Sequence, residues 1–402
     1  MDATAVSQDL LRVAVIGAGA FGKNHLRVYR ELEEAELGAA LVAAVEPDAT
    51  RAAETAGRYT IPVFASVDDL LRADLKLDAA TVAVPTVHHH AVASELLDAG
   101  IDLLVEKPLA AQLAEADDLL ARADKGQRIL QPGHLERFNP AILAVQPQLK
   151  RPMFFESHRL SIFGPRALDV DVVLDLMIHD LDIVLTFAAS PVREVRAVGL
   201  PILSPKVDIA NVRVEFESGC VANFTASRVS TERVRKLRFF EPRQYVSIDY
   251  ARQDLLVIRV DADAGKASPA DLIANLPPQV AAMLPPGIAE GIASGQIDLS
   301  KIDPVMIAQF AALAGIDPAV IAQFTNPAEP KAGLSFSKPP VTPGEPLRLE
   351  IHSFLESVRT RRAPQVTAQQ GRNALALALE IQASMAAHAR RAGLEDFFKP
   401  GV

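Results

Sequence analysis

A predicted strand, a glycine-rich turn and an amphipathic helix follow one another directly near the start of this chain of 402 residues. The strand is the apolar run 11–16 (LRVAVI), and the turn is Gly17-Ala18-Gly19-Ala20-Phe21-Gly22. Residues 23–34 then carry apolar side chains at helical spacing. In a G-x-G-x-x-G turn the first glycine allows the tight bend, the second admits a pyrophosphate, and the third lets the helix pack on the strand. This order predicts a parallel α/β domain that binds a dinucleotide at the helix N-terminus; a glycine turn without a nucleotide is the alternative.

An acidic residue completes this motif. Residues 40–45 (ALVAAV) predict a second strand that ends at Glu46, 24 residues after Gly22. This is about the spacing of a carboxylate that binds the adenosine ribose diol, and Asp48 is close enough to share the role. Because a carboxylate there would repel a 2′-phosphate, the sequence favours NAD over NADP.

Strands and helices continue to alternate as far as Pro132-Gly133. Residues 77–84 predict a strand, 88–99 a helix ended by Gly100, 103–105 a strand and 112–124 a helix. This alternation predicts a doubly wound parallel sheet, in which ligands bind beyond the carboxyl ends of the strands. The residues at those ends are Pro85-Thr86 and Glu106-Lys107-Pro108.

Three consecutive histidines, His88 to His90, follow one of these strand ends. Consecutive residues of a helix point in different directions, so they do not form a metal-binding face. We expect one of them near the cofactor and no metal.

A second domain is predicted after residue 132, because the alternation stops there. The strand-like segments are 153–160, 193–199, 210–217, 220–228, 234–240 and 244–260. Ser218-Gly219 is a hairpin signal between two of them. Successive strands without helices between them predict an α+β domain with an antiparallel or mixed sheet.

One helix, predicted over 170–187, carries an unusual number of titratable residues. Its apolar residues cover most of its circumference, so we expect it to be largely buried. Asp175 and His179 are four residues apart and therefore share a face. A carboxylate beside His179 would raise the pKa of its imidazole and fix its tautomer. The pair either orients the helix or takes part in catalysis. The other acidic residues of the helix are Asp171, Asp180 and Asp182.

Polar residues also gather around the predicted domain boundary. The segment 133–140 (GHLERFNP) connects the domains and is too polar for us to expect it in the core. Arg159 and Arg166 flank the segment 161–165. Arginines near a cleft bind phosphate or carboxylate, although isolated arginines are more often surface charges.

A proline- and alanine-rich insertion is predicted over 261–346. Two copies of Ile-Asp-Pro-x-x-Ile-Ala-Gln-Phe begin at Ile302 and Ile316, and Asp followed by Pro begins a short helix. The interpretation is a peripheral helical insertion, with a lid or a partner-docking element as the alternative. Helices are expected again over 347–361 and 367–391.

Composition excludes several classes of protein. The net charge of −9 argues against a general nucleic-acid binder. The single cysteine, Cys220, excludes an intramolecular disulfide and a Cys-based metal site. No apolar run reaches 18 residues, and the N-terminus lacks the pattern of a signal peptide, so we expect a cytoplasmic protein without a membrane span.

With these residues in place, the chain resembles the Gfo/Idh/MocA oxidoreductase family over about 1–260 and 346–395. The resemblance rests on the glycine turn, on Glu106-Lys107-Pro108 and on Asp175-x-x-x-His179-Asp180. It implies a Rossmann domain (1–131) and a C-terminal α+β domain (132–260 and 347–402) with a large open, mostly antiparallel sheet. Such a sheet often joins subunits, so a homodimer or homotetramer is expected.

The family also implies roles for residues of this chain. Lys107 and His179 would be the catalytic pair, with Asp175 beside them. The residues expected to bind NAD are Gly17, Gly19, Ala20, Phe21, Gly22, Glu46, Pro85, Thr86, His89, Glu106 and Lys107. Those expected to bind the substrate are His134, Arg137, Asn139, Arg159, Arg166 and His179.

Within the family, segments 133–140 and 166–182 resemble those of bacterial nucleotide-sugar 3-dehydrogenases. The resemblance implies NAD-dependent oxidation of the C3 hydroxyl of UDP-N-acetylglucosamine to a ketone. An aminotransferase would then aminate the ketone in lipid A synthesis. The alternatives are a UDP-N-acetylglucosaminuronate, a free sugar or a polyol as substrate, and a non-catalytic NAD-binding sensor or scaffold.

Overall fold

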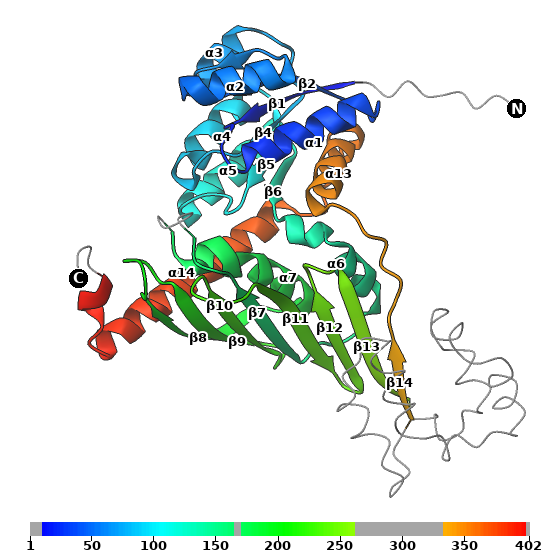
Figure 1. Cartoon of the computed structure of the whole chain (residues 1–402), viewed down its shortest axis with the longest axis vertical. Coiled ribbons are helices and arrows are strands. Elements are labelled where there is room, and N and C mark those ends of the chain that lie inside the picture. The colour runs from blue at the N-terminus through cyan, green and yellow to red at the C-terminus, as the bar shows by residue number, and fades with distance from the viewer. Residues whose placement is uncertain (1–9, 165–169, 262–332, 399–402) are drawn as a thin grey trace, which may run out of the picture.

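The computed structural model describes residues 10–164, 170–261 and 333–398. Two sheets lie one above the other, each with helices packed on it (Figure 1). The upper sheet is formed by strands within residues 11–133, and the lower, larger sheet by strands within 154–261 and 333–337 (Figure 1). No helix of the described residues is long and apolar enough to cross a membrane.

The first sheet has six parallel strands in the order β3-β2-β1-β4-β5-β6. Val13 and Val15 of β1 face the side covered by α1, whereas Ala14 and Ile16 face the side covered by α4 and α5. The predicted doubly wound sheet is thus confirmed. Its strands are β1 (Leu11–Ile16), β2 (Ala39–Val45), β3 (Val63–Phe64), β4 (Ala79–Val82), β5 (Asp102–Glu106) and β6 (Leu130–Gly133).

The helices of the first domain also follow the sequence pattern closely. Predicted helices 23–34, 88–99 and 112–124 correspond to α1, α4 and α5. The sequence analysis did not predict α2, α3 or the short strand β3. The helices are α1 (Gly22–Glu34), α2 (Ala49–Tyr59), α3 (Val67–Arg72), η1 (Thr86–His88), α4 (His89–Asp98) and α5 (Leu113–Gly126).

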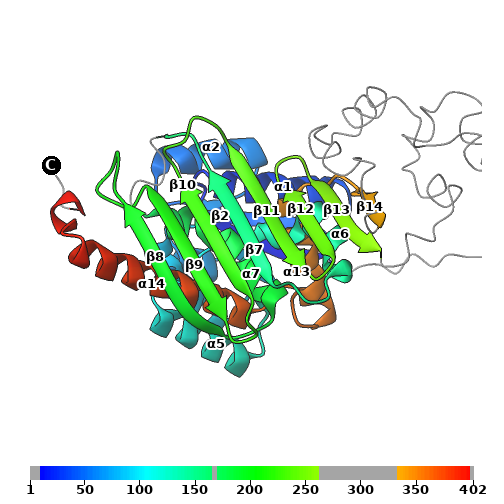
Figure 2. The ribbon, with the colours of Figure 1, turned by 90° about the horizontal axis from the view of Figure 1, so that it is seen from below.

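The second sheet has eight strands in the order β14-β13-β12-β11-β7-β10-β9-β8. Among the described strands, only β7 and β10 pair in parallel, so the mostly antiparallel sheet is confirmed. One face packs on α7 and α14, and Figure 2 shows the other face uncovered by any described element. The strands are β7 (Phe154–Leu160), β8 (Val192–Leu200), β9 (Ile209–Phe216), β10 (Val221–Ser227), β11 (Val234–Glu241), β12 (Gln244–Asp249), β13 (Asp254–Asp261) and β14 (Gly333–Ser337).

Two predicted boundaries in this sheet are wrong. Segment 244–260 is not one strand but the hairpin β12–β13, because the chain turns at 250–253, where Gln253 has a φ of 52°. The insertion does not reach 346 either, since β14 pairs with β13 at the sheet edge. Residues 262–332, including both Ile-Asp-Pro repeats, lie outside the described residues.

Short helical elements join the two sheets. They are η2 (Leu135–Phe138), α6 (Pro140–Val145) and η3 (Gln146–Gln148), followed later by η4 (Val173–Met177) and α7 (Ile178–Ala188). The predicted helix 170–187 therefore exists, but η4 is a π-helical turn rather than an α-helical one. The chain ends with α13 (Pro346–Thr360), α14 (Ala368–Arg391) and η7 (Glu395–Phe398).

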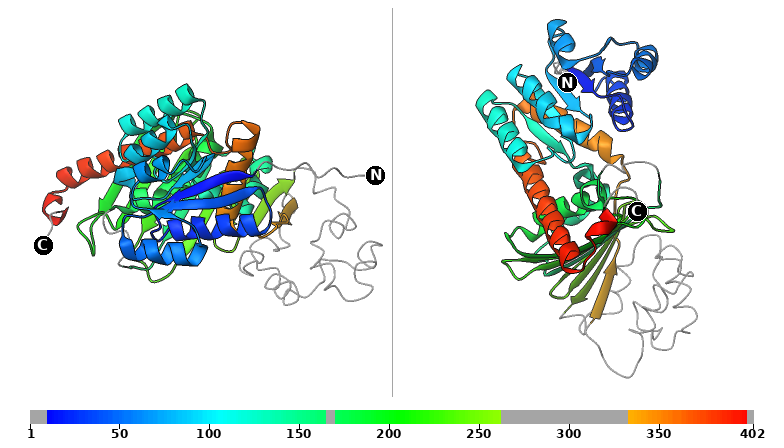
Figure 3. Two further views of the ribbon diagram at one scale, coloured as in Figure 1. Left: turned by 90° about the horizontal axis from the view of Figure 1, so that it is seen from above. Right: turned by 90° about the vertical axis from the view of Figure 1, so that its left-hand side faces the viewer.

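The two long C-terminal helices pack differently: α13 packs on the first sheet alone, and α14 reaches the second. Ile351, Phe354 and Leu355 of α13 lie in the hydrophobic cluster of the first sheet, together with Leu26 of α1. In contrast, α14 extends from the first domain down to the second sheet (Figure 3). The expected assignment of 347–402 to the second domain therefore does not hold for α13, because its apolar face completes the core of the first.

Candidate functional site

The glycine turn has the close contacts that its sequence predicts. Gly17 has a φ of 94°, and a Cβ there would lie 2.7 Å from the carbonyl oxygen of Ala83. A Cβ on Gly22 would lie 1.8 Å from the Gly17 oxygen, so both positions require glycine. A Cβ on Gly19 would meet no atom within 4 Å. The turn therefore presents an open backbone surface at Gly19, directly before α1.

Glu46 stabilises this turn by accepting a hydrogen bond from its backbone. Its Oε2 accepts a hydrogen bond from Ala18 N at 3.0 Å, and its Oε1 accepts one from Asp48 N at 3.0 Å and one from Arg51 Nη2 at 2.9 Å. Burial opposes ionisation of Glu46, but the hydrogen bonds from Arg51, Asp48 and Ala18 outweigh it and lower the pKa of the carboxyl. Glu46 is thus a buried anion at the end of β2.

The surroundings of the turn fit NAD. A cavity of about 560 Å³ is lined by Gly19, Ala20, Lys23, Asn24 and Arg51. The open backbone at Gly19 lines this cavity, and the N-terminus of α1 supplies N–H groups for a pyrophosphate. The sequence analysis missed Arg51, which lies five residues after Glu46 and pairs with it.

Lys107 joins the two domains. It follows β5, and its Nζ donates a hydrogen bond to the Asp175 carbonyl oxygen at 2.7 Å and lies 3.7 Å from Asp175 Oδ1. The side chain is only 12% exposed. Burial lowers the pKa of Lys107, while Asp175 and Glu106 partly offset this effect.

Two residues expected to bind NAD are buried and contact the protein around Lys107. His89 is buried, with Nδ1 2.8 Å from the Pro108 carbonyl oxygen and Nε2 2.9 Å from that of Val84. Glu106 is also buried, and its Oε1 lies 2.7 Å from Nε2 of His25. Neither side chain is open to a ligand, because each already contacts the protein interior.

His179 lies at the start of α7, next to the π-helical turn that holds Asp175. No hydrogen bond between described residues joins Asp175 to His179, and His179 Nδ1 is buried without a partner. Burial lowers the pKa of His179 well below its ordinary value, and the charges of Lys107 and Arg159 lower it further. The expected increase in its pKa is therefore wrong: in the π-helical turn, Asp175 interacts with Lys107 instead.

The connecting segment 133–140 is buried, contrary to expectation. Arg159 donates to both carboxylate oxygens of Asp180, at 2.7 and 3.1 Å, and to Glu136 Oε1 at 3.0 Å. Arg137 hydrogen-bonds Thr186 and lies 3.4 Å from Asp182. Polar residues are tolerated in this core because they are paired with one another.

Several residues expected to bind the substrate are therefore structural in this conformation. Asn139 caps α6 through Ala141 N and donates to the Tyr250 carbonyl oxygen at 3.0 Å. His134 is buried, as are the paired Arg137 and Arg159. Arg166 lies outside the described residues. Of the expected set, His179 is the described residue that remains partly exposed.

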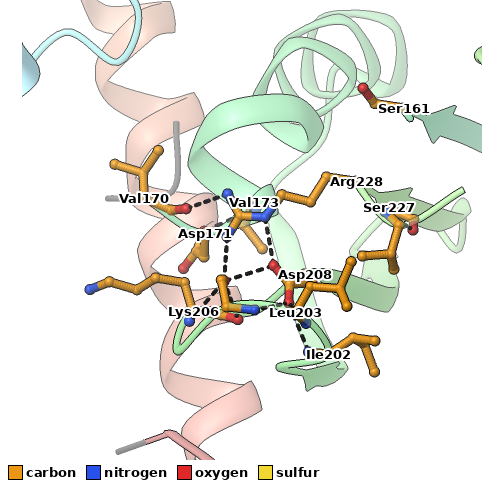
Figure 4. Close-up of polar contacts among 12 residues, drawn as sticks. Ser161, Val170, Asp171, Val173, Ile202, Leu203, Lys206, Asp208, Ser227 and Arg228 are labelled. Atoms are coloured by element: carbon orange, nitrogen blue, oxygen red, sulfur yellow. Dashed lines mark hydrogen bonds and ion pairs between the residues drawn. The ribbon is translucent and has the colours of Figure 1, made fainter. Parts of the chain in front are cut away.

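A buried ion pair fixes the segment that leads into η4. Asp208 accepts hydrogen bonds from the backbone N–H groups of Ile202, Leu203 and Ser204, at 2.6 to 2.8 Å, and from Arg228 Nε at 2.7 Å. Figure 4 shows Arg228 contacting both Asp208 and the carbonyl oxygen of Val170. Burial opposes ionisation, but these bonds lower the pKa of Asp208 to about 2.

A glycine turn that fits a dinucleotide, with a lysine and a histidine at the domain junction, is the arrangement expected of an NAD-dependent dehydrogenase. Residues 11–134 match the model of the oxidoreductase family with an NAD-binding Rossmann fold, Gfo/Idh/MocA, and residues 142–243 match the Gfo/Idh/MocA C-terminal domain. The chain belongs to the Gfo/Idh/MocA oxidoreductase family. Its cofactor is NAD, and it is an oxidoreductase.

Known relatives include several sugar and polyol dehydrogenases. The chain is 37% identical over 246 residues to the UDP-N-acetylglucosamine 3-dehydrogenase of Acidithiobacillus ferrooxidans, which covers 61% of this chain and 76% of that protein. It is 34% identical over 193 residues to an inositol 2-dehydrogenase of Leifsonia xyli subsp. xyli, covering 46% of this chain and 56% of the relative.

Solved structures show the same architecture. The structure of the Acidithiobacillus ferrooxidans UDP-N-acetylglucosamine 3-dehydrogenase superposes with a TM-score of 0.72 and 28% identity, covering 97% of this chain and 99% of the other. Levoglucosan dehydrogenase in complex with NADH and levoglucosan superposes with a TM-score of 0.69 and 15% identity, covering 94% and 98% of the two chains. This second likeness concerns the fold alone.

Proposed function

We propose that this enzyme oxidises the C3 hydroxyl of a nucleotide sugar, UDP-N-acetylglucosamine, to the 3-keto sugar. The contact between Lys107 and Asp175 at the domain junction, close to His179, supports the chemistry. Similarity to a UDP-N-acetylglucosamine 3-dehydrogenase over most of the chain supports the substrate. An aminotransferase that consumes the ketone in lipid A synthesis, and a homodimer or homotetramer formed through the second sheet, are part of the same proposal.

When bound, NAD supplies the acceptor for the hydride that leaves the carbinol carbon. The open backbone at Gly19 and the N-terminus of α1 would hold its pyrophosphate, with Arg51 at the edge of the same cavity. Glu46 would act mainly through the turn, since its carboxylate already accepts bonds from Ala18 and Arg51.

His179 would accept the hydroxyl proton. Its lowered pKa keeps the imidazole neutral at neutral pH, so a ring nitrogen is free to accept. Lys107 Nζ would hydrogen-bond the same substrate oxygen and stabilise the negative charge that develops there. Asp175 holds Lys107 in place, and His89 fixes the loop that carries it.

The test is NADH formation by the purified protein with NAD and UDP-N-acetylglucosamine, with mass analysis of the sugar. An aminotransferase and glutamate are included to consume an unfavourable ketone. A product lighter by two hydrogens, or its 3-amino derivative, is expected. Activity only on the uronate, a free sugar or a polyol would identify that compound as the substrate in place of UDP-N-acetylglucosamine. Absence of turnover on all of them, with tight NADH binding, would favour a sensor.

Replacing Lys107 by Met should lower kcat by about 10²–10⁴-fold, because the substrate oxygen loses its charged partner. The Kd for NADH, measured by fluorescence titration, should stay close to that of the wild type. Lys125→Met, at an exposed position of α5, is the matched control and should keep full activity. Turnover of Lys107→Met at the wild-type rate would contradict the assignment.

A further inference from the structure

Arg235 of β11 lies on the helix-covered face of the second sheet. Its neighbours Leu237 and Phe239, at alternate positions of the strand, are fully buried on that face. Arg235 is directly opposite Arg159 of β7 in the antiparallel pairing, so the two side chains project on the same side. Unlike Leu237 and Phe239, Arg235 is exposed.

Arg235 belongs to a row of residues that runs across the sheet. Beyond Arg159 the row continues through Ala226, Ala210 and Gly199, which are small. A Cβ on Gly199 would lie 2.4 Å from Met385 Sδ, so α14 covers that end of the row closely. At the other end, Arg159 is buried against Asp180 of α7, whereas Arg235 on the next strand is exposed.

The two arginines of this row differ in their partners. Arg159 is buried and paired with Asp180 and Glu136, and its guanidinium lies 5.1 Å from the ring centroid of Tyr250. Arg235 makes no side-chain hydrogen bond or ion pair with any described residue. Its charge nevertheless reaches His179, where, after burial and other nearby charges, it helps to lower the pKa of the imidazole. A guanidinium without an ion-pair partner among the described residues thus acts on the proposed proton acceptor.

We propose that Arg235 binds an oxyanion of the substrate and so contributes to substrate specificity. A guanidinium offers a planar fork of N–H donors that matches phosphate and carboxylate oxygens. The identification of this oxyanion as the diphosphate of a nucleotide sugar rests on the proposed function. The carboxylate of a sugar acid offers a guanidinium the same kind of oxygen acceptors. Many exposed arginines contact only water, but Arg235 lies on the covered face of the sheet, opposite Arg159, and its charge acts on His179.

The strand provides a matched control. Lys236, the next residue, points to the opposite face of the sheet and is partly exposed there. Both Arg235→Gln and Lys236→Gln remove one positive charge from β11, so a general effect of net charge would appear in both. Only an effect specific to the face of His179 would appear in Arg235→Gln alone.

The test is isothermal titration calorimetry of the NADH-bound enzyme with UDP, which has the diphosphate but no sugar to react. Arg235→Gln should weaken UDP binding at least about tenfold, whereas Lys236→Gln should stay within about twofold of the wild type. The KM for UDP-N-acetylglucosamine should rise more than kcat falls. The Kd for NADH should not change, because the turn that would hold its pyrophosphate lies in the other domain.

The outcomes separate this proposal from the proposed function. Equal UDP affinity of the wild type and Arg235→Gln would overturn the role of Arg235. If the wild type does not bind UDP, the titration is repeated with glucuronate: weaker binding by Arg235→Gln would support the oxyanion site and reject the nucleotide sugar. No dependence on Arg235 with either anion would overturn the proposal. If Arg235→Gln does not fold, Arg235→Lys, which keeps the charge but loses the fork, should still bind several-fold more weakly.

Discussion

At the scale of single residues, the domain junction contains more buried polar atoms than its hydrogen bonds satisfy. Glu350 of α13 is fully buried, and neither carboxyl oxygen has a partner among the described residues. Burial raises the pKa of Glu350 well above its ordinary value, and the nearby Glu106 and Asp182 raise it further. Glu350 therefore keeps its proton to a higher pH in the folded enzyme than in the unfolded chain.

This protonation makes stability depend on pH. Above the ordinary pKa of a glutamate, the unfolded chain is ionised at this position while the folded chain holds the proton. Each pH unit between the two pKa values should therefore cost about 1.4 kcal/mol of folding free energy. Glu350→Gln removes this proton uptake and should raise Tm more at pH 8 than at pH 5. Equal changes in Tm at the two pH values, measured by thermal melts, would contradict this prediction. The control is Glu356→Gln, at an exposed position of the same helix.

At the scale of elements, the chain holds η4 and α7 in place from several sides. Val172 N donates to the Val207 carbonyl oxygen at 3.1 Å, and Arg228 donates to that of Val170 at 2.9 Å. Asp208 binds Arg228 and the backbone of 202–204 together (Figure 4). The loop between β8 and β9 thus supports the start of the helical segment that presents His179.

Asp208→Asn should destabilise the protein by about 3 kcal/mol, because it removes the buried negative charge that contacts Arg228 and the backbone N–H groups of 202–204. The stabilisation that comes from ionised Asp208 is present above pH 4 and should be lost as the pH falls toward its pKa of about 2. Urea denaturation at neutral pH measures the change. Asp254→Asn, at an exposed carboxylate near Lys338, should change stability by less than about 0.5 kcal/mol. Similar values for the two variants would show that the buried pair is dispensable.

At the scale of the whole molecule, segments far apart in the sequence complete each domain. The core of the nucleotide-binding domain includes α13, which comes more than 200 residues after β6. Arg361 at the end of α13 hydrogen-bonds Asp102 at the start of β5, and Arg372 of α14 pairs with Asp117 of α5 at 2.8 Å. The first domain therefore depends on the end of the chain for its stability.

Phe354→Ala should consequently destabilise the nucleotide-binding domain by about 3–5 kcal/mol, because Phe354 is fully buried against its core. The measurement is the urea midpoint by circular dichroism, with and without saturating NADH. Phe397→Ala, at a side chain that is 59% exposed, should have almost no effect. A small effect of Phe354→Ala would mean that the domain folds without α13.

The sequence by itself determined the elements whose signals are local. The strand, turn and helix over 11–34, the strand that ends at Glu46 and the run Glu106-Lys107-Pro108 are where the sequence indicated, since periodicity and glycine spacing act within a few residues. Only the tertiary structure decided which distant partners meet. It buries 133–140 by pairing Arg159 with Glu136 and Asp180, gives α13 to the first domain, and leaves Arg235 exposed opposite Arg159. Strand register and charge pairing depend on residues far apart in the chain, so no local pattern could predict them.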